Sequence, residues 1–492
     1  MLTGCCRDPS FTGETSRSRC SEWEPKGKAK CYFSSSLSSK APMPDDLPDL
    51  SEPLNVYQLI DIALRNNPST KQSWADARAA AFNFRAQKSD LYPSFELDQS
   101  LSYTKQDSGL GSASTSSKSS IGGISFSGDG SGGSQYFNTL ITDFIGSYLL
   151  IDFGERCANI DVARQALYAS NWTHNRELQT VIFDVITAYY NQLNAVASYL
   201  ASLRSLEDAE TAFDSAEQML EVGVKNVADM LQARSNYAGS KLEVSNAKGN
   251  LMVSRGKLAR ALGLPADVEV EVDLLPEDLN IESISEGVED LIAAAKEHRP
   301  DLGAVHAQMM QKEAELRSAQ SAGMPTITAN VDLEDDHYIN KNKLDGYIYN
   351  GAFALNVPIF TGFYYTNKIR QARSELRAAC ANLRIHEYDV LLQVLEAYYD
   401  NQTAVENYYY SKDFLESSTE NYDVALENYK NGTGSILDVL NALKDLAQAR
   451  SQFVQSRTKW LTSLANIAYS TGTIGATGAN ALPYEKLRNV NP

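Results

Sequence analysis

Residues 429–442 read YKNGTGSILDVLNA and lie between two long segments whose apolar residues recur at helical spacing. Asn431, Gly432 and Gly434 are residue types that end one helix and allow another to begin shortly afterwards. The stretch therefore predicts the tip of a helical hairpin.

An earlier counterpart of this stretch lies 209 residues upstream. The matched pairs are Gly223 with Gly432, Asp229 with Asp438, and Ala233 with Ala442. Nearer the N-terminus the offset is 232, as in Pro68 with Pro300 and Pro93 with Pro325. The first copy is thus 23 residues longer, and the tract 108–134, in which 19 of 27 residues are Ser or Gly, accounts for the difference. We interpret the chain as an internal duplication.

The charge of the chain limits its partners. A net charge of −18 and a pI near 4.8 argue against a nucleic-acid-binding protein, which needs clustered Lys and Arg. The acidic balance fits a solvated surface or a cavity that attracts cations. No run of 18 or more apolar residues occurs, so we expect no transmembrane helix.

Four of the six cysteines fall within the first 31 residues, which excludes a disulfide-stapled body. The other two, Cys157 and Cys380, are expected to be small buried residues. Residues 1–52 show no periodicity and predict a disordered or tethering extension. Within them, Leu2-Thr3-Gly4-Cys5 resembles a bacterial lipoprotein cleavage box, which makes Cys5 a candidate for lipidation. Two alternatives stay open, a signal peptide upstream of Met1 or a chance match.

Two hairpins of alternating residues are predicted, at 94–153 and 326–360. In the first, apolar side chains alternate with polar ones over about ten residues, the length that crosses a bilayer when tilted. The apolar positions are Phe95, Leu97, Leu101 and Tyr103, then Leu140, Phe144, Tyr148 and Leu150; in the second hairpin they are Ile327, Ala329, Val331 and Leu333, then Phe353, Leu355, Val357 and Ile359. A soluble antiparallel hairpin with one solvent-exposed face remains an alternative. Because two isolated hairpins are marginal in water, we expect other chains to complete the sheet.

Very long helices are predicted between these hairpins and the tips. Residues 155–221 contain no proline, and 67 helical residues span about 100 Å. Segments 229–261 and 436–469 return, and shorter helices are expected within 55–91 and 286–322. Such lengths are typical of coiled coils or bundles.

The resulting domain organisation has five parts. They are an extension over 1–52, a first repeat over 53–265 with its tip near 222–229, a linker over 266–285, a second repeat over 286–472 with its tip near 430–438, and a tail over 473–492.

No enzymatic chemistry is indicated. The five histidines form neither an HExxH pair nor a metal-ligand cluster with cysteine. Residues 128–133 formally match a dinucleotide fingerprint, but neither a strand nor a helix flanks them, so we interpret them as loop composition. The duplicated Ala188-Tyr189-Tyr190 and Ala397-Tyr398-Tyr399 favour helix packing over a ligand platform. The sequence therefore predicts no catalytic residue, no cofactor and no metal site.

The order of helix, strand hairpin, long helix, glycine tip and returning helix resembles the TolC-like outer-membrane efflux proteins over about residues 54–472. Both tips carry the resemblance, as do the strand exits at 148–154 and 355–362. The resemblance implies a mainly α-helical chain with a transmembrane β part. Three copies would each give four strands to a 12-stranded β-barrel in the outer membrane of a Gram-negative-type bacterium, continuous with a helical coiled-coil barrel that extends into the periplasm.

The resemblance also implies partners and a gate. A periplasmic adaptor and an inner-membrane pump dock at the tips, and the expected adaptor contacts are Val222, Gly223, Val224, Asn431, Gly432 and Thr433. Asp438 matches the first position of the family's acidic constriction, where three converging carboxylates repel one another and favour a blocking cation. Asn441 stands at the second acidic position without the charge, and Gly434 replaces an arginine latch. Tyr429 and Asp229 match the other latch, so we expect a hydrogen bond between them to hold the gate closed.

The predicted function is the outer-membrane exit duct of a tripartite efflux or type I secretion system, gated at its periplasmic tips. The alternative is a soluble oligomeric coiled-coil scaffold without channel activity. A hydrolase or oxidoreductase ranks third among the functions considered, because it would need a pocket of converging titratable side chains that this sequence does not display.

Overall fold

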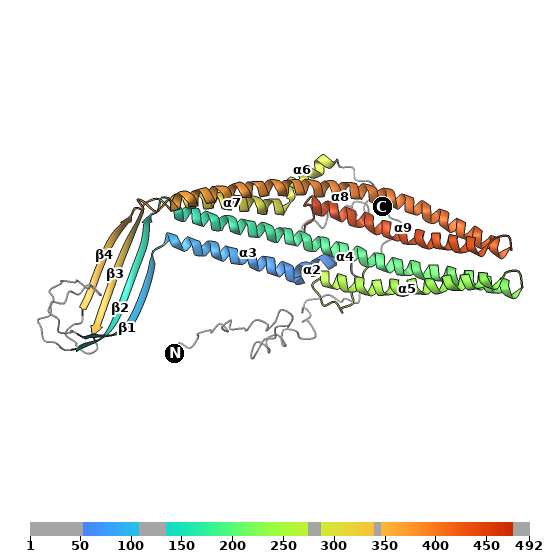
Figure 1. Ribbon diagram of the computed structural model, residues 1–492, viewed down its shortest axis with the longest axis horizontal. Helices are drawn as coiled ribbons and strands as arrows, with labels where there is room; N and C mark the ends of the chain where they lie inside the picture. The colour runs from blue at the N-terminus through green and yellow to red at the C-terminus, as the bar shows by residue number, and fades with distance from the viewer. Residues whose placement is uncertain (1–52, 108–133, 274–286, 339–345, 476–492) are drawn as a thin grey trace, which may run out of the picture. The chain divides into compact units, whose positions relative to one another are not determined.

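The computed structural model describes residues 53–107, 134–273, 287–338 and 346–475 (Figure 1). Cys5, the extension over 1–52, the Ser/Gly tract, most of the predicted linker and nearly all of the tail lie outside the described residues. The elements are α2 (Val56–Asn66), α3 (Pro68–Gln87), η1 (Lys88–Leu91), β1 (Ser94–Asp107), β2 (Ser134–Ile151), α4 (Glu155–Glu221), α5 (Val227–Ala261), α6 (Val288–His298), α7 (Pro300–Ser321), β3 (Thr326–Tyr338), β4 (Gly346–Asn356), α8 (Tyr364–Lys430) and α9 (Ile436–Ser470).

These elements form two compact units, and each unit draws on both repeats. The helical unit takes its described residues from 1–73, 175–299 and 390–492. The sheet unit comprises 74–174 and 300–389. The boundary between the two compact units therefore does not coincide with the boundary between the two sequence repeats.

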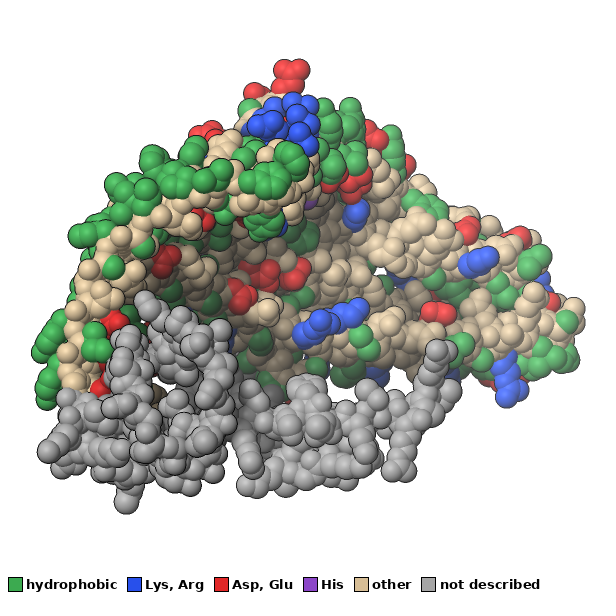
Figure 2. All heavy atoms as spheres, turned by 60° about the vertical axis from the view of Figure 1, so that its left-hand side comes forward, with side chains coloured by type: hydrophobic (Ala, Val, Ile, Leu, Met, Phe, Trp, Pro, Cys, Tyr) green, Lys and Arg blue, Asp and Glu red, His purple; other side chains and the backbone are tan. Residues whose placement is uncertain are grey.

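The sheet unit contains one antiparallel sheet in the order β1-β2-β3-β4, so β2 and β3 join the two hairpins side by side (left in Figure 1). On one face, Phe95 stacks on Phe144 with 5.7 Å between ring centroids. On the other face, the register aligns Asp98 with Asp143 and Asp143 with Glu334. Figure 2 shows hydrophobic side chains along the outer face of the sheet and acidic ones on its hollowed inner face. The predicted two-faced strands are thus formed.

The second hairpin is shorter than expected. β4 ends at Asn356, which pairs with the first residue of β3, Thr326. The prediction that Val357 and Ile359 continue the strand is wrong. Pro358 has no N–H to donate to a ladder, and β3 offers no residue beyond Thr326 to pair with.

The long helices have matching lengths in the two repeats. α4 and α8 each contain 67 residues, and α5 and α9 each contain 35. In the helical unit each long helix and its returning partner form a hairpin, and the two tips lie at the same end of the unit (right in Figure 1).

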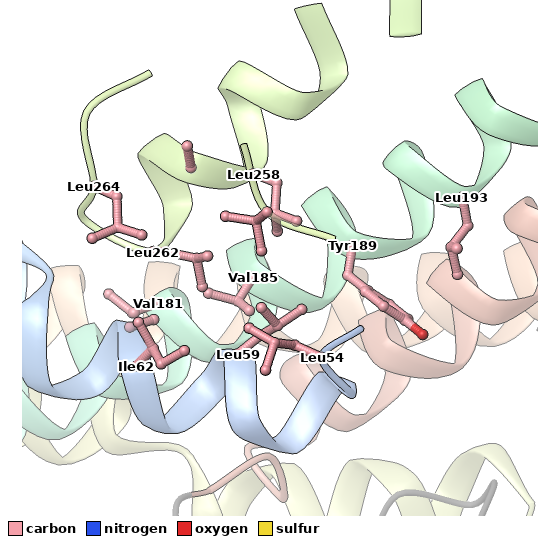
Figure 3. Packing of buried hydrophobic residues seen from close by; sticks show 13 residues of the cluster. Leu54, Leu59, Ile62, Val181, Val185, Tyr189, Leu193, Leu258, Leu262 and Leu264 are labelled. Carbon is pink, nitrogen blue, oxygen red and sulfur yellow. The ribbon is translucent and has the colours of Figure 1, made fainter. Parts of the chain in front are cut away.

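The core of the helical unit lies where α2, α4 and α5 meet. Leu59, Val185 and Leu258 are fully buried there, and α2 presents Leu59 and Ile62 on one helical face (Figure 3). Tyr189 packs in the same cluster and donates its hydroxyl proton to the carbonyl of Asp273 at 3.0 Å. For Tyr189, the expected packing role is confirmed.

Two helix ends meet at a joint beside this core. Asn67 caps the C-terminus of α2, and its Nδ2 donates to the carbonyl of Ala261 at the end of α5, at 3.0 Å. Gly263 follows α5 with a φ of 75°, and a Cβ there would lie 2.7 Å from the Cα of Asn67. The close approach therefore requires glycine.

The second repeat forms a corresponding joint. Arg299 caps the C-terminus of α6, and its guanidinium donates to the carbonyl of Ser470 at 3.0 Å. Gly472 has a φ of 73°, and a Cβ there would lie 2.8 Å from the carbonyl carbon of His298. We call the pair formed by Asn67 and Gly263 the first joint and the pair formed by Arg299 and Gly472 the second joint.

Cys157 and Cys380 are both exposed, so the prediction that they are buried is wrong. They lie on faces of α4 and α8 that the described part of this chain does not cover. None of the helices in the described ranges combines the length and the apolarity needed to cross a membrane. Those ranges also hold no cluster of His, Cys, Asp or Glu suited to a metal ion.

Candidate gate at the helix tips

Both tips are built by the same helix-ending turn. Gly223 has a φ of 77° and Gly432 a φ of 79°, which favours glycine after a helix. The next residue donates its N–H to the carbonyl five positions back, Val224 to Met219 and Thr433 to Asn428, each at 3.0 Å. These bonds satisfy carbonyls that the helix end leaves free. The predicted equivalence of the tips is confirmed in their backbone.

The side chains that start the returning helices differ. Asn226 accepts a hydrogen bond from the backbone N–H of Asp229 at the start of α5. Ser435 and Asp438 instead form a reciprocal capping box at the start of α9, with Asp438 accepting from the backbone N–H of Ser435 at 3.3 Å. Asp438 is exposed and complements the helix dipole. The predicted gate residue therefore also has a local structural role.

A groove of about 660 Å³ runs beside the second tip between α8 and α9. Asp438 and Asn441 both line it, and Asp445 lines it one turn further along α9. The structure therefore brings the two predicted constriction residues together and adds a second carboxylate. The spacing of Asp438 and Asp445, seven residues on one helix face, was the available signal for Asp445.

Tyr429 lies fully buried at the end of α8, packed with apolar residues of both hairpins such as Ala216 and Val439. Its hydroxyl has no hydrogen-bond partner among the described residues. The expected hydrogen bond from Tyr429 to Asp229 is therefore not formed in this structure. Burial first, and then the negative charge of nearby Asp229, raise the pKa of the Tyr429 phenol. A buried ring that fills a cluster replaces the expected polar latch.

Another side chain bridges the two tips. Lys225, half-buried in the first tip, donates its Nζ proton to the carbonyl of Gly434 in the second tip at 2.9 Å. The same Nζ lies 5.3 Å from the centroid of the Tyr429 ring. A Cβ at Gly434 would meet the backbone N of Tyr429 at 3.0 Å, so the turn leaves little room for the arginine that Gly434 replaces. Sequence reasoning missed Lys225, since no periodic pattern points to it.

The six residues expected to contact an adaptor are exposed. Val222 and Val224 are 76% and 55% exposed, which is unusual for valine, while Asn431 and Thr433 give the second tip a more polar surface. Their role in binding remains a prediction.

Comparison with known proteins decides the family. The sequence pattern of the outer membrane efflux proteins matches residues 59–264 and 291–473. The chain belongs to this family. It is similar to protein CyaE of Bordetella pertussis, with 25% identity over 86% of this chain and 85% of the relative. It is also similar to the outer membrane protein TolC of Escherichia coli, with 23% identity over 88% and 85% of the two chains.

The fold has matches among solved structures. The outer-membrane channel OprN superimposes with a TM-score of 0.73 at 19% identity, covering 86% of this efflux protein and 90% of OprN. Family and fold together make this chain an outer-membrane efflux channel, located in the outer membrane. The family consists of channels rather than enzymes, and membership decides against the soluble scaffold.

Proposed function

We propose that this channel is the exit duct of a tripartite efflux or type I secretion system. Three copies close the sheet into the outer-membrane pore, and their helical units form a tunnel into the periplasm. An adaptor docks on the two tips and links the duct to an inner-membrane pump. The gate is the narrow end of the tunnel, where Asp438 and Asn441 of each copy face the axis.

One observation carries this proposal. The two tips lie at the same end of the helical unit, joined by Lys225, and the groove beside them holds Asp438, Asn441 and Asp445. Three such grooves around an axis would gather six carboxylates. Unit charges about 4 Å apart in water repel by about 1 kcal/mol per pair, so a bound cation stabilises their convergence.

The test is planar-bilayer conductance of the detergent-purified protein with calcium or cobalt titrated on one side. Wild type is expected to give a small cation-selective conductance that these ions block. Asp438→Ala should weaken the block by about tenfold, because one carboxylate of each copy is lost. Glu416→Ala, exposed on α8 and outside both cavities that Asn441 lines, serves as the matched control and should leave the block unchanged.

Two results would contradict the proposal. If the wild-type protein inserts and conducts without any block by divalent cations, the acidic gate is contradicted. If the protein sediments as a monomer in mild detergent, the trimeric pore is contradicted.

A further inference from the structure

We propose that Lys225 is a positioning residue that clasps the first tip to the second and thereby holds the gate in the arrangement seen here. The inference deepens the proposed function, since it names the side chain that restrains the gate. It stands on a hydrogen bond and a ring contact made by one ammonium group.

The position of Lys225 in the chain makes the clasp possible. Its own backbone N–H donates to Met219 at 3.2 Å, so the turn that ends α4 fixes where the side chain begins. From there the four-carbon stem reaches the other hairpin, and the residue is half-buried. The two tips are thus joined through a side chain whose base is held by the backbone.

The acceptor is equally fixed. The N–H of Gly434 donates to the carbonyl of Asn428 at 2.9 Å, which holds the peptide in the turn and leaves the Gly434 carbonyl directed at Lys225. A hydrogen bond from a charged donor is stronger than one between neutral groups. Partial burial reduces the competition from water, so the bond restrains the tips more than an exposed contact would.

The ring of Tyr429 adds a second attraction. An ammonium within about 6 Å of an aromatic centroid is attracted by the electrons of the ring face. Tyr429 is fully buried and anchored in the cluster shared by both hairpins, so it offers Lys225 a rigid surface. Gly434 stands in place of the family's arginine latch, as the sequence indicates, and the cation that joins the tips comes from the first hairpin instead of the second.

Other polar contacts between the hairpins lie farther from the tips. Arg450 of α9 bonds to the carboxylate of Asp208, and the Tyr422 hydroxyl donates to the carbonyl of Asp208 at 3.1 Å. Asp208 lies on α4 about 20 Å before the tip, at about 1.5 Å per residue. Releasing Lys225 therefore loosens the turns at the tips, while the apolar cluster around Tyr429 and the contacts of Asp208 still hold the hairpins together.

The experiment combines hydrogen exchange with conductance on the full-length protein. In Lys225→Met the stem is kept and the donor is lost. The amides of residues 432–436, on the opposite tip, are expected to exchange about tenfold faster, and the conductance to rise. Lys225→Arg keeps the cation and should restore both values. Lys430→Met removes an exposed lysine for which the described residues provide no hydrogen bond or ion pair, and should change neither.

The outcomes separate this inference from the proposed function. Unchanged exchange at residues 432–436 in Lys225→Met would overturn the clasp. Faster exchange that Lys225→Arg does not restore would also overturn it, because the effect would then not depend on the cation. Faster exchange with unchanged conductance would uphold the clasp and contradict the gate. If no variant conducts, the proposed function fails, while the exchange rates still decide the clasp.

Discussion

At the first joint the amide of Asn67 donates to Ala261, and at the second joint the guanidinium of Arg299 donates to Ser470, at the same distance of 3.0 Å. Both joints bring two helix C-termini together, where free carbonyls need donors. Two different side chains thus donate to the free carbonyls at equivalent helix C-termini. At the tips the reverse holds, since identical turns carry different side chains, with exposed valines on the first and a capping box on the second. Backbone geometry is shared between the repeats, and side-chain chemistry distinguishes them.

The largest expected effect tests whether the joints and the tips need glycine for the same reason. Gly472→Ala combines a positive φ with a backbone overlap at 2.8 Å, so it should cost about 3 kcal/mol or more of unfolding free energy. Gly432→Ala has a similar φ with nothing within 4 Å, and should cost about 1 kcal/mol. Thermal unfolding followed by circular dichroism measures both. Equal losses would show that φ alone matters and that the close approach at the joint does not.

A smaller effect should separate the two joints. Arg299→Ala removes a buried charged donor and leaves the Ser470 carbonyl without it, at a cost of about 2 kcal/mol. Asn67→Ala removes a neutral donor from a half-buried site, at a cost of about 1 kcal/mol. Denaturant unfolding of the detergent-solubilised protein gives both values. A larger loss in Asn67→Ala would contradict the view that the two donors differ mainly in charge and burial.

The smallest effect concerns acid stability at the two strand exits. Burial raises the pKa of Asp152, but backbone N–H groups of Arg156 and Gly154 and the Arg156 guanidinium outweigh it, so its pKa lies below the usual value. Because the folded pKa is lowered, the stabilisation is complete above the unfolded pKa of about 4 and is lost as pH falls through the folded pKa. The second exit, Phe360-Thr361-Gly362, has no carboxylate there.

Asp152→Asn should therefore lower the melting temperature at pH 7 and flatten its decline below pH 4. Asp161→Asn, whose carboxylate forms more exposed ion pairs with Arg164 and Arg317, is the control and should change the acid slope less. Melting curves between pH 2 and pH 7 measure both slopes. Identical acid slopes in wild type and Asp152→Asn would place the acid sensitivity elsewhere.

Much of the fold follows from local rules that the sequence displays. Glycine at 223 and 432 predicted both tips, and the period of two in 94–103 predicted β1. The end of β4 was missed because it depends on the length of its neighbour, β3. The exposure of Cys157 and Cys380 was missed because the cover of a long helix depends on which other helices pack against it.

The candidate site was predictable only in part. Asp438 and Asn441 were placed by the motif around Gly432, and the groove contains both. The contacts of Tyr429 and Lys225 depend on how two hairpins, distant in the chain, approach each other, and on the rotamer of a flexible stem. Neither of these is fixed by periodicity or by turn chemistry.

Because corresponding helices in the two repeats have equal numbers of residues, the two tips end at the same height along the helix axes. Inserting one residue into α4 alone would advance its tip by about 1.5 Å and rotate it by about 100°, which would move Lys225 away from Gly434. Indels in the helices are therefore tolerable only as sets of whole turns repeated in α4, α5, α8 and α9. The 23-residue difference between the repeats falls instead between Pro93 and Tyr189, where the Ser/Gly tract accounts for it. The repeats can differ in length in that tract, whereas α4 must match α8 in length and α5 must match α9.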